Sequence, residues 1–104
     1  MHILVSFCNV RTSGLPLLGL FDSAASEFRV LDLPCELARC SGITGLAASD
    51  RFVYAVAQAS DRQVTGAFSG TSVLLIFDRK DLTLRSRYAF RSAVDVHSLW
   101  VRGD

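Results

Sequence analysis

The chain has 104 residues, of which half are hydrophobic and a fifth are charged, and its formal net charge is +1. That length allows one domain of the usual ~100–200 residues at most, and the hydrophobic content excludes a disordered chain. A net charge near zero gives no basis for binding nucleic acid or a membrane surface. No apolar run reaches the ~20 residues of a membrane-spanning helix. With no signal-peptide pattern at Met1–Val10, we expect a cytoplasmic protein with reduced cysteines.

Short runs rich in Val, Ile, Leu, Phe and Tyr recur along the chain, with turn-forming Asp, Ser and Gly between them. This pattern predicts strands joined by tight turns, together with a single helical turn after Pro34. A further strand is expected between Asp22 and residue 40, which makes eight in all. The other expected strands are His2–Phe7, Leu17–Asp22, Gly42–Ala47, Phe52–Ala57, Val73–Phe77, Leu82–Phe90 and Val94–Val101.

The chain contains an internal repeat. The run that ends in Phe21-Asp22 matches the run that ends in Phe77-Asp78, at an offset of 78 − 22 = 56. Ile3 aligns with Val53 at an offset of 53 − 3 = 50, and Ile43 aligns with Val96 at 96 − 43 = 53. Because the offsets differ only slightly, the strands recur while the loops between them vary in length.

Four-stranded units at a period near ~50 residues are typical of β-propeller blades. With blade strands named A to D, the chain reads B-C-D, A-B-C-D, A. The sequence therefore predicts an all-β fold of two permuted four-stranded blades: repeat 1 takes about residues 1–40 plus 94–101, and repeat 2 takes about 41–93. A β-sandwich accounts for the strands but not for the pairwise repeat.

Two blades cannot close a ring, because repeat arrays need about three or more units to cover their apolar faces. Either the chain is a piece of a larger propeller, or several copies assemble with the C-terminal strand of one beside the N-terminal strand of another. We favour a homo-oligomer, with three copies giving six blades.

The blade-like segments Gly42–Ala47, Val53–Val56, Val73–Asp78 and Val94–Leu99 resemble six- and seven-bladed propellers of the broad NHL, SMP-30 and YVTN kind. They are also similar to uncharacterised bacterial propellers with a D-x-H-S inner strand. The resemblance covers almost the whole chain and implies the fold, but it implies no particular activity.

Asp95 and His97 are the first candidates for a functional site. On a strand they project to the same face, and an inner strand would bring them to the central channel, where a ring of them could bind a divalent metal. The alternative is a structural role, with His97 bonded to backbone and Asp95 capping a turn. No other cofactor is expected.

Trp100, the only tryptophan, is a candidate for stacking a sugar or for packing between blades. Arg62 and Phe68 lie in the polar loop Ala59–Thr71, which is a candidate ligand surface or an irregular insertion. The sequence favours a non-enzymatic binding or scaffold module with a small-molecule, glycan or protein ligand. The alternatives are a metal-assisted hydrolase or lyase at Asp95 and His97, and a glycan-binding lectin.

Overall fold

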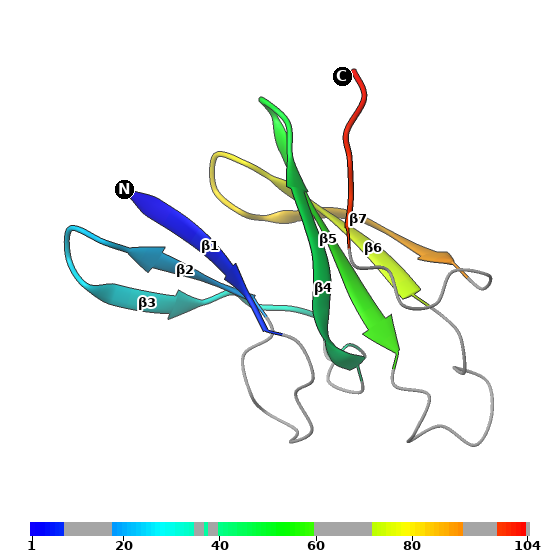
Figure 1. Cartoon of the computed structure of the whole chain (residues 1–104), viewed down its shortest axis with the longest axis horizontal. Coiled ribbons are helices and arrows are strands. Elements are labelled where there is room, and N and C mark those ends of the chain that lie inside the picture. The colour runs from blue at the N-terminus through cyan, green and yellow to red at the C-terminus, as the bar shows by residue number, and fades with distance from the viewer. Residues whose placement is uncertain (8–17, 35–36, 38–39, 60–71, 91–97, 104) are drawn as a thin grey trace.

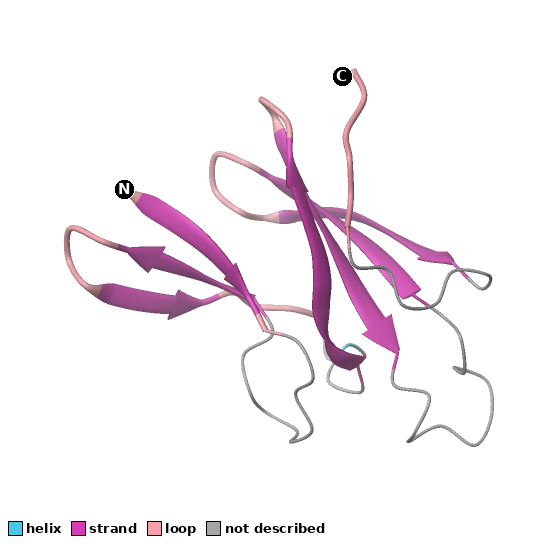
Figure 2. Cartoon of the chain, viewed as in Figure 1, coloured by secondary structure: helices cyan, strands magenta, loops and turns pink. Residues whose placement is uncertain are grey.

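The computed structural model of the chain describes residues 1–7, 18–34, 37, 40–59, 72–90 and 98–103. In these ranges the chain forms two antiparallel sheets, one of three strands and one of four (Figures 1 and 2). The prediction of an all-β fold is therefore confirmed.

The first sheet is a meander in which each strand pairs with the next along the chain. Ile3 lies opposite Phe21, and Phe21 lies opposite Phe28. Because successive side chains of a strand point to opposite faces, this row lies on one face, and Leu4 and Leu20 lie on the other. The strands are β1 (His2–Ser6), β2 (Leu18–Asp22) and β3 (Glu27–Val30).

The second sheet is also a meander, and its first strand is the most irregular. The pairing of β4 with β5 shifts register twice, between Cys40 and Gly42 and between Ile43 and Gly45. Such irregularities bend a strand and increase its twist, and β4 curves visibly in Figure 1. The strands are β4 (Cys40–Ala48), β5 (Phe52–Ala59), β6 (Ser72–Asp78) and β7 (Leu84–Phe90).

The hydrophobic core lies between the two sheets. Leu18 of β2 and Leu75 of β6 are fully buried, and Phe77 is 1% exposed. Burial of such a side chain contributes about 1.5–3 kcal/mol. One backbone hydrogen bond also joins the sheets, from the N–H of Ile43 to the carbonyl of Phe7 at 2.8 Å. The sheets approach each other at this end and spread apart toward the other (Figure 1).

The turns from β2 to β3 and from β6 to β7 have the same geometry. In each, the Asp that ends the first strand accepts at Oδ1 a 2.9 Å hydrogen bond from the backbone N–H two residues later, at Asp22 and at Asp78. Four residues after each Asp, a residue other than glycine takes a positive φ: Ser26 at 55° and Leu82 at 58°. The two Phe-Asp pairs of the sequence therefore introduce the same kind of turn.

The predicted pair of four-stranded blades is met only in part. The first sheet has three strands, neither described sheet closes on itself, and the described residues form no propeller. Of the predicted strand Val94–Val101, residues 94–97 lie outside the described residues, and Ser98–Val101 form no strand. The strand predicted from Leu82 begins at Leu84, because the positive φ of Leu82 belongs to the turn.

The single helical turn predicted after Pro34 falls on a segment that is only partly described. The N–H of Leu37 donates to the carbonyl of Pro34 at 2.9 Å, which is the i to i+3 bond of a tight turn. The Leu37 side chain is buried in the core. This turn therefore fixes a core side chain on the connection between the two sheets.

Gly19 lies beneath an aromatic ring. A Cβ at this position would meet the ring of Phe28 on the neighbouring strand. Glycine in a strand otherwise costs about 0.5–1 kcal/mol relative to alanine, so the ring compensates for the missing side chain. We expect Gly19→Ala to stabilise a Phe28→Ala chain by about that amount, and to give no gain or a loss in the native chain. Chemical denaturation of the four chains of this cycle measures the difference; an equal gain in both backgrounds would contradict the packing.

The Asp78 turn predicts a pH dependence of stability. Its carboxylate pKa is lowered, first by the backbone N–H of Lys80 and then by the guanidinium of Arg85, whose Nη2 lies 2.9 Å from Oδ2. A carboxyl with a depressed pKa in the folded state stabilises the fold above its unfolded pKa, and this contribution is lost as pH falls through the folded value.

We therefore expect the free energy of unfolding to fall on acidification below about pH 4. Asp78→Asn should flatten this dependence, and Arg85→Gln should flatten it less because the backbone hydrogen bond remains. Urea unfolding at a series of pH values measures both slopes. Equal slopes in native and Asp78→Asn chains would contradict the assignment.

Candidate functional site

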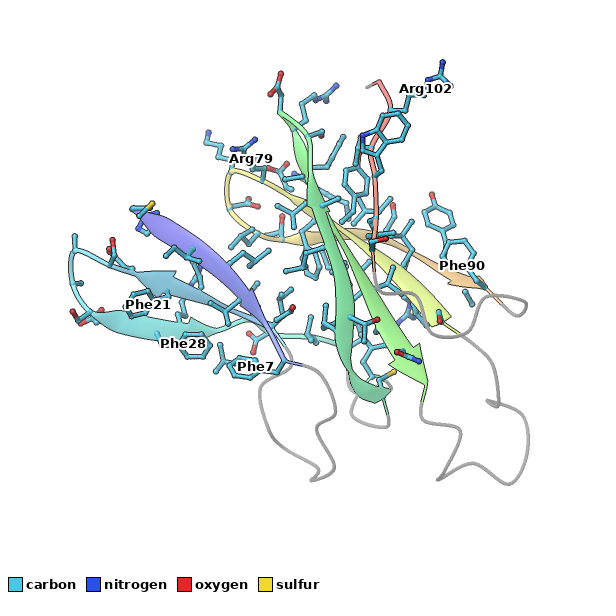
Figure 3. The ribbon with its side chains drawn as sticks, viewed as in Figure 1. Phe7, Phe21, Phe28, Arg79, Phe90 and Arg102 are labelled. Atoms are coloured by element: carbon cyan, nitrogen blue, oxygen red, sulfur yellow. The ribbon has the colours of Figure 1, made fainter. Side chains whose placement is uncertain are left out.

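The face of the first sheet that points away from the second sheet is apolar. Ile3 and Phe28 are each 42% exposed there, and Val30 is 50% exposed. The rings of Phe7 and Phe28 meet edge to face, with centroids 5.9 Å apart. Figure 3 shows Phe7, Phe21 and Phe28 gathered on this side of the molecule. We call this the first outer face; from the strand registers it comprises Ile3, Val5, Phe7, Phe21, Phe28 and Val30.

The second sheet carries a comparable surface on its own far side. Tyr88 and Phe90 of β7 are 55% and 39% exposed, and Figure 3 shows Phe90 at the end of the molecule opposite to the first outer face. A hollow of about 440 Å³ lies on this surface, beside Tyr54 and Ile76. We call it the second outer face; it comprises Tyr54, Leu74, Ile76, Tyr88 and Phe90, while Val56, which points to the same side, is buried.

The C-terminal segment lies against the second outer face. A Cβ on Gly45 of β4 would stand 3.3 Å from Cγ of Leu99, and Gly45 lies opposite Val56, on the face turned away from the first sheet. Figure 1 shows the segment on that side of β4. Ser98–Gly103 therefore runs along the sheet as a loop, with Trp100 83% exposed.

Both edges of the first sheet, at β1 and at β3, have no partner strand among the described residues. The β1 edge is the one whose counterpart in the second sheet is paired. In the second sheet, the corresponding edge of β5 is covered by β4. An exposed row of backbone N–H and C=O groups is a template for pairing with another strand, so this edge is a second potential interaction surface.

A cavity of about 710 Å³ opens between the two sheets where they spread apart. Its volume falls within the usual range of small-molecule sites, about 300–1,000 Å³. Arg79, labelled in Figure 3, stands at the tip of the β6–β7 turn and donates from Nη1 to the carbonyl of Ser49 at 2.7 Å. The cavity is lined by apolar residues (Leu4, Leu20, Leu46, Ala47, Ala48, Val53, Leu82) and by polar or charged ones (His2, Arg29, Arg79, Lys80, Asp81).

Most of the predicted site residues cannot be placed. Asp95, His97, Arg62 and Phe68 lie outside the described residues. Among the described residues there is no group of three or more His, Cys, Asp or Glu that could hold a metal ion. The metal-site and loop-site hypotheses therefore stay predictions, as does glycan binding at Trp100, whose exposure is compatible with either of its proposed roles.

None of the residues of the two outer faces was among the site residues predicted from the sequence. Their signal is the alternation of β1 and β3, where Ile3, Val5, Phe28 and Val30 are apolar and lie on the face that does not contact the core. On the second sheet, Tyr88 is more than half exposed. Which apolar side chains lie uncovered depends on how many sheets one chain contains, and that number is not a property of any single strand.

The chain matches no family model, no curated protein and no solved structure. The described fold and surfaces define it as an all-β protein of two antiparallel sheets around a shared core, with an apolar face at each end. Among the described residues the edge strands β1, β3, β4 and β7 each pair on one side only. No helix among its described residues is long and apolar enough to cross a membrane.

Proposed function

We propose that the chain is a non-enzymatic scaffold or binding module that assembles with copies of itself into a ring of β-propeller blades. The observation that carries this proposal is the pair of apolar outer faces at opposite ends of the two-sheet unit. A monomer rarely exposes large contiguous apolar patches, and such patches mark interaction sites. When the first outer face of one copy covers the second outer face of the next, the contact is head to tail and a ring can close.

The internal repeat supports the same assembly. The row Ile3, Phe21, Phe28 of the first sheet corresponds to the row Val53, Phe77, Leu84 of the second. The offsets are 53 − 3 = 50, 77 − 21 = 56 and 84 − 28 = 56, which are those of the sequence repeat. In addition, the N–H of the residue after Asp22 donates to Met1, as the N–H of the residue after Asp78 donates to Arg51.

Units built alike stack alike, so the packing of one sheet on the other within a chain is a template for the packing between chains. Propellers contain about four to eight blades, and three copies of a two-sheet chain give six. The ring would act as a scaffold through its loop faces and channel.

A charge on the first outer face tests the proposal. Phe28→Asp places a carboxylate where the next copy packs, and we expect it to convert the assembly to monomer at concentrations where native chain is assembled. Ala25→Asp, in the exposed turn between β2 and β3, is the matched control and should assemble normally. Sedimentation velocity measures the masses, and circular dichroism verifies that the Phe28→Asp monomer keeps its strands. A Phe28→Asp chain that assembles like the control would overturn the proposed use of this face.

A further inference from the structure

The first sheet lacks a strand that the second sheet has. β1 pairs with β2 in the register in which β5 pairs with β6. The pair Phe21–Phe28 corresponds to Phe77–Leu84, beyond which β6 and β7 shift register. However, β5 also pairs with β4, whereas the equivalent edge of β1 is open among the described residues. Among the described residues, Ser98–Val101 is a segment outside both sheets that could supply this strand. It aligns with β4 at the offset 99 − 46 = 53, which pairs Leu99 with Leu46 and Trp100 with Ala47.

The position of this segment indicates whether it pairs with β1 of its own chain or with β1 of a second copy. Its own β1 belongs to the sheet that packs on the core face of β5, whereas Leu99 lies over Gly45 on the opposite face. In the proposed ring, that opposite face is where the first sheet of the next copy sits. Leu99 therefore lies on the same face of the second sheet as the β1 edge of a second copy would in the ring.

The register of the cross-copy pairing follows from the second sheet. There Leu46 lies opposite Ala55, and Ala47 lies opposite Tyr54. Subtracting the offset of 50 between β5 and β1 gives 55 − 50 = 5 and 54 − 50 = 4. Leu99 of one copy is thereby matched to Val5 of the next, and Trp100 is matched to Leu4.

In this register the side chain of Trp100 would also fill the cavity between the sheets of the second copy. Residues directly opposite each other in antiparallel strands share a face of the sheet, and Leu4 and Leu20 of that face line the cavity. A Trp100 paired with Leu4 would point into the cavity of the second copy, whereas in the isolated chain its side chain is 83% exposed. An exposed tryptophan and a cavity with an apolar wall at Leu4 and Leu20 thus become complementary across one interface.

We propose that Ser98–Val101 of one copy pairs as an antiparallel strand with β1 of a second copy, with Leu99 opposite Val5 and Trp100 in the inter-sheet cavity of that copy. This inference rests on the proposed self-assembly and names its partner, its segment and its register. The strand would complete the three-stranded sheet to four and would cover the open edge, as closure does in barrels and propellers.

The test is a disulfide between copies. In the Val5→Cys, Leu99→Cys chain the two thiols would be directly opposite across the strands, within reach of a disulfide. The Leu4→Cys, Leu99→Cys chain is the matched control, because its thiols would point to opposite faces of the sheet. Under mild oxidation we expect covalently linked copies only in the first chain, with the bridge between residues 5 and 99 located by peptide mapping, since three natural cysteines are present.

Each outcome separates the two proposals. Native-like mass without a bridge between residues 5 and 99, or bridging of the control to the same extent, would overturn the register while leaving the assembly intact. Monomeric mass of the native chain would remove the assembly and this inference together.

Fluorescence gives an independent readout. We expect the emission of Trp100 to shift to shorter wavelength as the protein concentration rises through the assembly range, because the indole leaves water and packs against Leu4 and Leu20. Trp100→Ala should weaken assembly at least about tenfold, as expected for a buried interface tryptophan. Emission that stays at the wavelength of exposed tryptophan in the assembled state would contradict the placement.

Discussion

Phe77→Ala should lower the free energy of unfolding by about 3–5 kcal/mol. Phe77 is the largest of the fully buried side chains, and it lies with Leu75 and Val53 in the core between the sheets. Its removal loses the transfer free energy of the ring and leaves a cavity that the two sheets can only partly close. Since small domains are stable by about 5–15 kcal/mol, this loss is a large part of the total.

Phe90→Ala is the matched control for this prediction. It removes the same atoms from the second outer face, where Phe90 is 39% exposed, and should cost the single chain much less. Urea unfolding at one fixed protein concentration measures both losses, because self-assembly makes apparent stability depend on concentration. Equal losses for the two variants would show that the core does not lie where the burial places it.

Leu99→Pro should abolish assembly. Proline fixes its own φ and restricts the residue before it, so it is tolerated poorly inside a paired strand. Residue 99 falls within the segment that corresponds to β4, and proline there would also remove the side chain that packs over Gly45. We expect monomer by light scattering at concentrations where the native chain is assembled.

Arg102→Ala is the control for Leu99→Pro. By the offset 102 − 53 = 49, residue 102 corresponds to Ser49, whose N–H donates to the carbonyl of Phe52 at 2.9 Å. Arg102→Ala keeps this backbone N–H and should assemble normally. A Leu99→Pro chain that still assembles would argue against the C-terminal segment as part of the closure.

Strand positions were well predicted from the sequence, because alternation and turn chemistry are local. The strand predicted at Phe52–Ala57 is β5, and the Phe-Asp pairs correctly mark the ends of β2 and β6. The prediction failed in detail at Leu82, where backbone conformation and not hydrophobicity decides the boundary.

The terminal strand could not be settled from the sequence, because a strand requires a partner. The apolar run Val94–Val101 has the composition of a strand, yet its described part, Ser98–Val101, is a loop in the single chain. If the partner is the β1 edge of another copy, the same residues form a strand only after assembly. Composition reports the potential to pair, while the partner and its distance are properties of the assembly.

The candidate site was predicted less well than the fold. Asp95 and His97 were predicted as a metal-binding site because of their side-chain chemistry, and both lie outside the described residues. Trp100 was chosen as a lone aromatic, but its proposed partner is a cavity formed by Leu4 and Leu20 of the first sheet with Leu46 of the second. Such a cavity is created by tertiary packing and has no pattern in the local sequence.

The native mass of the purified chain tests the central claim most directly. One chain has a mass of 11.4 kDa, so a closed ring of three would have 3 × 11.4 = 34.2 kDa. We expect a single small closed oligomer by native mass spectrometry, with three copies favoured. A chain that stays at 11.4 kDa at all concentrations, with both apolar outer faces in water, would contradict it.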